Sequence, residues 1–174
     1  MINEFEDLCR SRKSIRKFTD KLIEEDEITK VLNIINSAPS AGNLQAYEVI
    51  VVKSKDKIRK LYEASLQQKF IAEAPIVLVF VAKPQESSKI YFERGEQLYC
   101  IQDATIACTY AMLACEALDI SSTWVGAFEE DKVKELLNCR ADEIPIALLP
   151  IGHTLSKKVL FTNRKDLSEL VREV

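Results

Sequence analysis

The chain has 174 residues, of which 47% are hydrophobic and 29% charged, a composition typical of one globular domain. At this length a domain buries roughly 70% of its unfolded surface, so disulfides or a metal are not needed for folding. The net charge of −3 is spread along the sequence, which argues against nucleic acid as the main partner.

The first half of the chain predicts alternating helices and strands. In the segment 24–37, apolar residues recur at helical spacing, acidic residues occupy the first turn, and Pro39 follows to end the helix. Residues 47–53 and 76–81 are continuous apolar runs, as in strands buried on both faces. We expect, in order, a short helix over 3–9, a helix over 24–37, a strand over 47–53, a helix over 54–66 and a strand over 76–81.

The second half is dominated by one apolar helix over residues 97–118. Its apolar residues cover almost the whole circumference, so it either crosses the centre of the core or is covered in part by a second subunit. Gln102, Asp103 and Glu116 interrupt it, so it falls short of a membrane span. Around it we expect a polar loop over 83–89, an extended segment or short strand over 123–127, a helix over 129–137 and a strand over 144–151.

The order of these elements indicates an α/β or α+β sandwich with a mixed or partly parallel sheet covered by helices. The tail from residue 156 has no core pattern until Leu167, Leu170 and Val171, and it could dock on a partner. Residues 1–8 contain three acids and lack the order of a signal peptide. We expect a single domain over residues 1–174, a cytoplasmic location, and neither a membrane nor a nucleic-acid partner.

Several kinds of site are disfavoured by what the sequence lacks. The five cysteines form no CxxC pair and the single histidine, His153, gives no zinc spacing, so we expect no metal site. The four glycines form neither GxGxxG nor a P-loop, which argues against a Rossmann dinucleotide site and a P-loop site. No serine lies in a nucleophile-elbow sequence, and we interpret His153 as a structural or surface residue.

A cationic segment, RSRKSIRKF at residues 10–18, lies near the N-terminus. Arg12 and Arg16 are four residues apart, with Lys13 and Ser14 between them. A guanidinium binds phosphate through a planar fork, and a serine hydroxyl adds a short-range donor. Such a segment can hold a phosphate, but a basic cluster taken alone is more often a solvated surface patch, so both interpretations stay open at this point.

A polar segment, APSAGNLQ at residues 38–45, follows one helix later and precedes an apolar strand. Asn43 and Gln45 each carry both donors and acceptors, which suit the edges of a planar, hydrogen-bonding ligand. Together the cationic and polar segments predict a phosphate site beside an amide-rich wall.

Several motifs, in order, resemble the compact branch of the FMN-dependent nitroreductase family. The resemblance implies an α+β fold, a three-layer α/β/α sandwich with a mixed central sheet, and a homodimer with FMN at the subunit interface. The matching stretches span about residues 10–165: RSRKSIRKF, APSAGNLQAYEVIVV, EAPIVLV (73–79), QDA (102–104), STWVGAF (122–128) and a closing strand at 146–152.

The resemblance also implies which residues of the cationic segment meet the cofactor. Arg12 and Ser14 would hold the ribityl phosphate, and Lys13 belongs to the same motif. Arg16 would lie near the N1–O2 edge of the flavin, where a fixed cation favours the charge of the reduced ring. Arg164 matches a C-terminal basic residue that meets the phosphate in many relatives.

The remaining cofactor contacts implied by the resemblance come from three other places. Gln68 matches an amide that faces the flavin ring in many relatives. Val125 and Gly126 match a segment that covers the ring near N5, and Gly126 allows close backbone approach. The other subunit would supply a set from the polar segment: Pro39, Ser40, Ala41, Asn43 and Gln45.

Four positions depart from the family pattern. Ala46 replaces the usual proline, Tyr47 the usual tryptophan, and Val125 stands where the classical bacterial enzymes have a glutamate. The usual C-terminal pair of cations is reduced to Arg164. These departures bear on the substrate more than on the flavin.

The activity implied by the resemblance is that of an FMN-dependent NAD(P)H oxidoreductase. A hydride would pass through flavin N5 to a small acceptor, such as a nitroaromatic compound, a quinone or a flavin, with ping-pong kinetics and no catalytic side chain. The alternatives are other flavin chemistry on the same fold (of the azoline-dehydrogenase, dehalogenase or flavin-destructase type), a non-catalytic FMN-binding protein, and a dimeric domain that binds no flavin.

Overall fold

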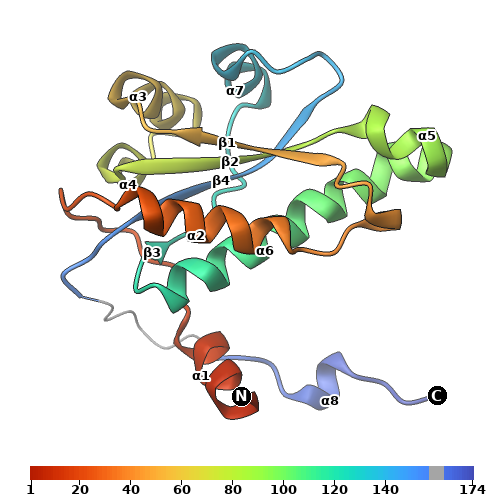
Figure 1. The fold of residues 1–174 in the computed structure, drawn as a ribbon, viewed down its shortest axis with the longest axis horizontal. Helices are drawn as coiled ribbons and strands as arrows, with labels where there is room; N and C mark the ends of the chain where they lie inside the picture. Colours follow the sequence, from red (N-terminus) through yellow and green to blue (C-terminus); the bar gives the residue numbers. More distant parts are fainter. Residues whose placement is uncertain (157–162) are drawn as a thin grey trace.

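The computed structural model describes residues 1–156 and 163–174 and contains a four-stranded sheet between two layers of helices (Figure 1). The strands pair antiparallel throughout this sheet. Within the described residues, the parallel pairing of a mixed sheet occurs only at an isolated bridge between Ser14 and Ser122. The α+β class and the three layers are thus confirmed. In spatial order the strands are β1 (Tyr47–Val52), β2 (Ile76–Ala82), β4 (Ile144–Gly152) and β3 (Ser121–Ser122).

Strand β2 lies at the centre of the core, and all of its residues are buried. A strand with both faces covered by helices has no solvent side, which is why its sequence is a continuous apolar run. Its side chains alternate between two clusters, Ile76, Leu78 and Phe80 on one face and Val77, Val79 and Val81 on the other.

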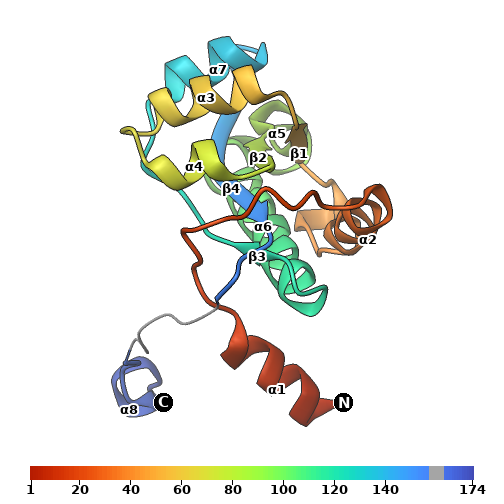
Figure 2. The ribbon, with the colours of Figure 1, turned by 90° about the vertical axis from the view of Figure 1, so that its left-hand side faces the viewer.

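Helices cover both faces of the sheet (Figures 1 and 2). Two of them begin with side-chain capping of the first turn. Glu24 and Glu27 form a capping box, and the Ser54 hydroxyl accepts the Lys57 N–H. The first face carries α2 (Glu25–Asn36) and α6 (Cys100–Ala117), and the second carries α3 (Lys55–Ala64), α4 (Lys69–Glu73) and α7 (Glu130–Leu137).

Helix α6 packs on the sheet with one side and leaves the opposite side half covered. Its buried side is built of small residues and includes Ala107 and Ala111. On the opposite side Thr105 and Leu113 are half-buried and Thr109 is exposed. Within the described residues, α6 is therefore covered by the chain on one side and does not cross the centre of the core.

Among the described residues, one helical stretch, Pro84–Ala117, is long and apolar enough to cross a membrane. Its most apolar window is 44% buried inside the protein. The packing of α6 against β2 and β4 accounts for that composition without a membrane.

The polar loop predicted over residues 83–89 is wrong, because the segment belongs to helix α5 (Pro84–Arg94). Pro84 lies in the first turn, where its missing N–H costs nothing, and Ser87 is fully buried. A short π-helix, η2 (Gly95–Tyr99), packs so closely on α5 that a Cβ at Gly95 would lie 2.5 Å from the Ser87 carbonyl oxygen. This tertiary packing, which the local polarity does not reveal, stabilises the helix.

Two other elements differ from expectation in extent or place. The short helix α4 was not anticipated between residues 66 and 76. Strand β3 is two residues long and precedes the predicted segment 123–127, in which Val125 alone forms a bridge, to Leu148. His153 directly follows β4 and is half-buried, and its backbone carbonyl oxygen accepts the Thr19 N–H at 2.9 Å.

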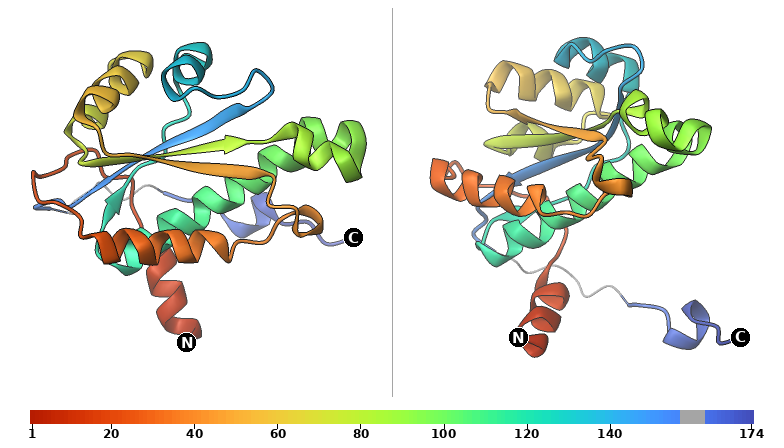
Figure 3. Two further views of the ribbon diagram at one scale, coloured as in Figure 1. Left: turned by 45° about the horizontal axis from the view of Figure 1, so that its top comes forward. Right: turned by 45° about the vertical axis from the view of Figure 1, so that its right-hand side comes forward.

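The terminal helices α1 (Ile2–Ser11) and α8 (Leu167–Leu170) bury none of their residues. Both lie outside the three-layer body (Figures 2 and 3). Ile2 and Phe5 of α1 and Leu167 and Leu170 of α8 are large apolar side chains that stay more than half exposed. The ends of the chain thus offer apolar surface that the body does not cover.

Candidate functional site

The cationic segment leaves α1 at Arg12 and is fixed against strand β3. The Ile15 N–H donates to the Ser122 carbonyl at 3.0 Å, and the Ile15 side chain is buried. Arg12 and Lys13 are half-buried, yet neither forms an ion pair within the described residues. Cations without carboxylate partners on an anchored backbone are suited to hold an anion.

Arg16 lies on the α4 side of this segment. Its guanidinium carbon is 5.9 Å from the centroid of the Phe70 ring, within range of a cation–π interaction. Gln68, just before α4, donates through Nε2 to the carbonyls of Ser65 and Ala127, at 3.0 and 3.2 Å. These contacts bring the predicted residues Arg16 and Gln68 to the same end of the sheet as the segment around Ala127.

Val125 and Gly126 differ in what they can contact. Val125 is 3% exposed, and its N–H and C=O both pair with Leu148, at 2.9 and 3.0 Å. Gly126 is exposed and carries no side chain. Of these two predicted residues, Gly126 is therefore the one whose surface is open to a ligand.

The polar segment forms a tight loop between α2 and β1 that contains the short helix η1 (Ala41–Asn43). The Gln45 N–H donates to the Ser40 hydroxyl at 3.0 Å, and Gln45 Nε2 donates to the Asn43 carbonyl at 3.0 Å. Pro39, Asn43 and Gln45 are exposed. The loop thus presents amide side chains to solvent on a backbone closed by its own hydrogen bonds.

The polar loop is attached to the N-terminal part of α6. The Ala41 N–H donates to Asp103 Oδ1 at 2.9 Å, and the Ala46 N–H donates to Asp103 Oδ2 at 3.4 Å. Asp103 is 2% exposed. In the sequence, this residue interrupts the apolar helix and belongs to a stretch that resembles a family motif, and its burial beneath the loop becomes visible only in the fold.

The structure does not bring the cationic and polar segments together within one chain. The polar loop lies by Asp103 near the start of α6, whereas the cationic segment lies by β3, which follows the end of α6 (Figure 1). At 1.5 Å per residue, the helix between Asp103 and Ala117 separates the two ends by about 20 Å. Each end therefore carries one part of the predicted site.

Arg164, the last predicted contact, is exposed in the tail before α8. It follows residues 157–162, which lie outside the described part of the chain. Its predicted meeting with a phosphate stays a prediction.

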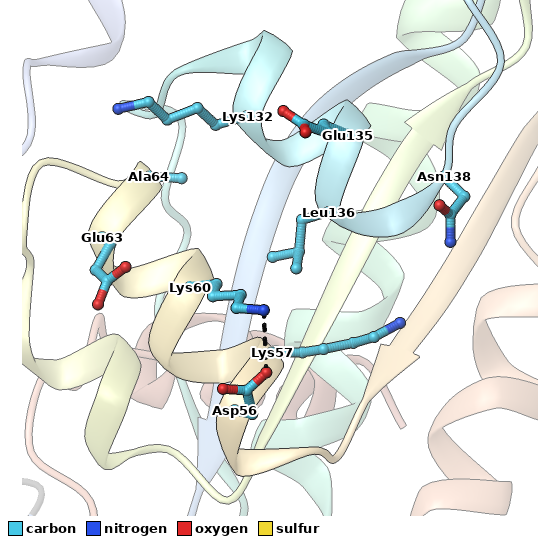
Figure 4. A pocket seen from close by; sticks show the side chains of 9 residues that line it. All are labelled: Asp56, Lys57, Lys60, Glu63, Ala64, Lys132, Glu135, Leu136 and Asn138. Carbon is cyan, nitrogen blue, oxygen red and sulfur yellow. Dashed lines mark ion pairs between the residues drawn. The ribbon is translucent and has the colours of Figure 1, made fainter.

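A groove of about 560 Å³ lies elsewhere, between α3 and α7 (Figure 4). None of the predicted site residues lines it. Its charged side chains balance one another, with Lys60 paired to Asp56 at 3.2 Å. The lining residues are Asp56, Lys57, Lys60, Glu63, Ala64, Lys132, Glu135, Leu136 and Asn138. We assign no part of the predicted site to this groove.

The cysteines of α6 are buried and unpaired, as their apolar context predicts. Burial raises the pKa of the Cys115 thiol to about 12 and that of the Cys108 thiol well above its ordinary value. Little thiolate forms at neutral pH, and it is the thiolate that reacts. These residues therefore offer no nucleophile to the site.

We expect a disulfide reagent at mildly alkaline pH to modify only Cys9 and Cys139 in the native protein. Cys100, Cys108 and Cys115 should react only after denaturation, because burial both shields these thiols and raises their pKa. Peptide mapping by mass spectrometry identifies which of the five cysteines the reagent has modified. Rapid labelling of Cys108 or Cys115 in the native protein would contradict the buried position of α6.

Comparisons with known proteins agree with this geometry. The nitroreductase family model matches residues 9–69 and 65–153. The chain is 30% identical to a nitroreductase family protein from Clostridium novyi NT, whose crystal structure superimposes with a TM-score of 0.78 over 86% of this chain and 84% of that one.

Two further relatives carry functional names. The chain is 28% identical over 165 residues to an FMN reductase (NAD(P)H) of Bacillus subtilis, covering 87% of this chain and 66% of that protein. The structure of an NADPH:FMN oxidoreductase from Vibrio harveyi, complexed with NAD⁺, superimposes with a TM-score of 0.88 at 21% identity, over 97% of this chain and 76% of that one. At that identity the second likeness establishes the fold.

Proposed function

The chain belongs to the nitroreductase family, and from that premise we propose that it is an FMN-dependent oxidoreductase. It takes a hydride from NAD(P)H and passes it to a small electron-poor acceptor. The whole chain, residues 1–174, acts as one FMN-binding domain, and the working unit is a homodimer. The observation that carries the proposal is the pair of complementary half-sites at opposite ends of α6, one cationic and one rich in amides.

The donor set of the cationic segment fits the phosphate of FMN. Arg12 supplies a planar guanidinium, Lys13 an ammonium and Ser14 a hydroxyl, all on backbone held by Ser122. A dianionic phosphate needs several such donors at once, and no carboxylate of the described residues competes for these cations. We assign the phosphate to Arg12, Lys13 and Ser14, with Arg164 as an additional cation from the tail.

A second set of donors in the same half-site suits the ring. The Arg16 guanidinium, packed on Phe70, provides a fixed positive charge for the ring edge at N1 and O2. Gln68 provides an amide, and the exposed Gly126, next to the buried Val125, lets the backbone approach closely. These residues bind and orient the ring, and they do not need to transfer a proton.

The other wall of the site comes from the partner subunit. A twofold axis near the middle of α6 would lay two copies of this helix antiparallel. The polar loop of one chain would then lie beside the cationic segment of the other. Such a contact would cover the half-exposed stripe around Thr105, Thr109 and Leu113. The partner would supply Pro39, Ser40, Ala41, Asn43 and Gln45, and the apolar ends α1 and α8 add surface for the same contact.

When bound, FMN supplies the redox chemistry, since its ring accepts a hydride at N5 and gives it up again. The protein needs no acid–base pair of its own, and we assign no catalytic side chain. Donor and acceptor use the same open face in turn, which predicts ping-pong kinetics. Electron-poor acceptors such as nitroaromatic compounds, quinones or free flavins fit this scheme.

Anaerobic mixing of the FMN-loaded protein with NADH, and separately with NADPH, tests the proposed reaction. We expect one or both donors to bleach the absorbance of the oxidised flavin, and we expect added quinone or nitroaromatic compound to restore it. Steady-state rates at several acceptor concentrations should give parallel double-reciprocal lines. If flavin binds but neither donor reduces it, the proposed reaction is wrong. The protein then either binds flavin without catalysis or uses it in a different reaction.

A further inference from the structure

The backbone of the polar loop adopts an energetically unfavourable conformation. Gly42, Asn43 and Gln45 have φ values of 55°, 57° and 48°, in the left-handed region. Glycine and asparagine tolerate this conformation, but a glutamine there is strained. Backbone strain of this kind persists only where the surroundings fix it, and it is concentrated at functional sites.

The Asp103 carboxylate fixes both ends of this strained stretch. It accepts the N–H of Ala41, just before the stretch, and the N–H of Ala46, just after it, at 2.9 and 3.4 Å. The carboxylate is nearly fully buried and has no cation partner in the described part of the chain. The two carboxylate oxygens therefore each accept one loop N–H, from the half-buried Ala41 and the buried Ala46, and hydrogen bonds to a carboxylate are the stronger kind.

Helix α5, which precedes α6 in the chain, also supports the loop, through Tyr91. A Cβ at Gly42 would lie 2.5 Å from the Tyr91 hydroxyl oxygen, so this hydroxyl rests on the loop backbone. The Tyr91 ring packs edge-on against Tyr99, with the centroids 5.1 Å apart, directly before α6. The loop is thus held between α5 and the buried carboxylate of α6.

The charge of Asp103 acts on its surroundings as well. The pKa of the Tyr47 phenol is raised, first by burial and second by the negative charge of Asp103. Tyr47 follows the loop directly and donates its hydroxyl to the Ile35 carbonyl at 3.2 Å. The Asp103 carboxylate therefore lies close to both the loop and the first residue of β1.

We propose that Asp103 is a positioning residue for the cofactor site, a buried carboxylate that clamps the loop 41–46 in the shape that presents its amide side chains to FMN. The inference rests on the proposed function, because it assigns the loop to the partner's flavin. Asp103 itself lies beneath the loop and acts through the N–H groups of Ala41 and Ala46.

Asp103→Asn gives the sharpest test, since it keeps the shape of the side chain and replaces one acceptor oxygen by an NH₂ donor. Ala111→Gly is the matched control, because it destabilises the same helix from a buried position without touching the loop. Two quantities are measured on each variant: the dissociation constant for FMN, by fluorescence titration, and the exchange rates of the Ala41 and Ala46 amides in the flavin-free protein.

We expect Asp103→Asn to raise the dissociation constant for FMN roughly 10- to 100-fold, the effect of losing a hydrogen bond to a charged group. Exchange at Ala41 and Ala46 should accelerate by a similar factor. Ala111→Gly should leave both quantities close to wild type. Unchanged FMN affinity in Asp103→Asn would overturn the proposal, even if the two amides exchanged faster, and unchanged exchange would overturn the clamp itself.

Ala41→Pro provides a second variant if Asp103→Asn does not fold. Residue 41 begins a helical turn after an extended Ser40, a place that accepts proline, and the change removes the N–H that donates to Asp103 while it keeps a small apolar side chain at position 41. We expect weaker FMN binding here too, and wild-type affinity would overturn the proposal. If the wild-type protein binds no FMN, the proposed function fails, whereas the exchange rates still test the clamp.

Discussion

Thr109→Arg is expected to remove dimerisation and FMN binding together. Thr109 is exposed in the middle of α6, where a twofold contact would place the helix against its own copy. An uncompensated buried charge costs about 3–5 kcal/mol, and a symmetric interface contains the change twice. Because the proposed site takes its polar loop from the partner, the monomeric variant should lose FMN as well. Sedimentation velocity, recorded in both the protein and the flavin absorbance bands, measures the two losses at once.

Thr29→Arg is the control for this change. Thr29 is likewise an exposed threonine within a helix, and its hydroxyl donates to the carbonyl four residues earlier, as that of Thr109 does. It lies on α2, away from the proposed contact, so Thr29→Arg should remain dimeric and flavin-bound. A Thr109→Arg protein that stays dimeric, or a monomer that keeps FMN at wild-type affinity, would contradict the shared site.

Arg12→Ala is expected to weaken FMN binding roughly 10- to 100-fold, the range for a lost charge-assisted hydrogen bond, while the dimer stays intact. Arg12 is half-buried beside Ser14 and has no ion pair among the described residues, so its removal breaks no structural contact seen in the fold. Equilibrium titration with FMN measures the loss. Riboflavin, which lacks the phosphate, should bind Arg12→Ala and wild type nearly alike.

Lys17→Ala is the matched control for Arg12→Ala, since it removes an exposed cation of the same segment that has no assigned contact. It should change FMN affinity little. Wild-type affinity in Arg12→Ala, or an equal loss in Lys17→Ala, would show that the segment is a general basic patch and not a phosphate site.

Much of the fold could be predicted because hydrophobic pattern determines it. The strand β2 reads directly as a continuous apolar segment because helices cover both of its faces, and α6 does so because it packs on the sheet and is apolar on its outer side as well. Helix α5 could not be predicted. It is polar in sequence and exists because η2 packs against it, with Gly95 allowing the close approach to Ser87. Such tertiary support leaves no local periodic signal.

For the site, the sequence indicates which residue types can bind a ligand, but it does not show where those residues lie relative to one another. Residue type suffices to propose Arg12 and Asn43 as ligands, because guanidinium and amide groups have known partners. Sequence could not show that their segments lie at opposite ends of α6, nor that Val125 is buried while Gly126 is exposed. It also could not show that Asp103 lies beneath the loop, since the pairing depends on the fold.

The central claim is that two chains build each flavin site. The most direct test is to load the purified protein with FMN, remove the excess, and measure the mass and flavin content of the sedimenting species. We expect one FMN per chain, all of it on a dimer. Flavin bound stoichiometrically to a monomer, or no bound flavin after reconstitution, would contradict the account.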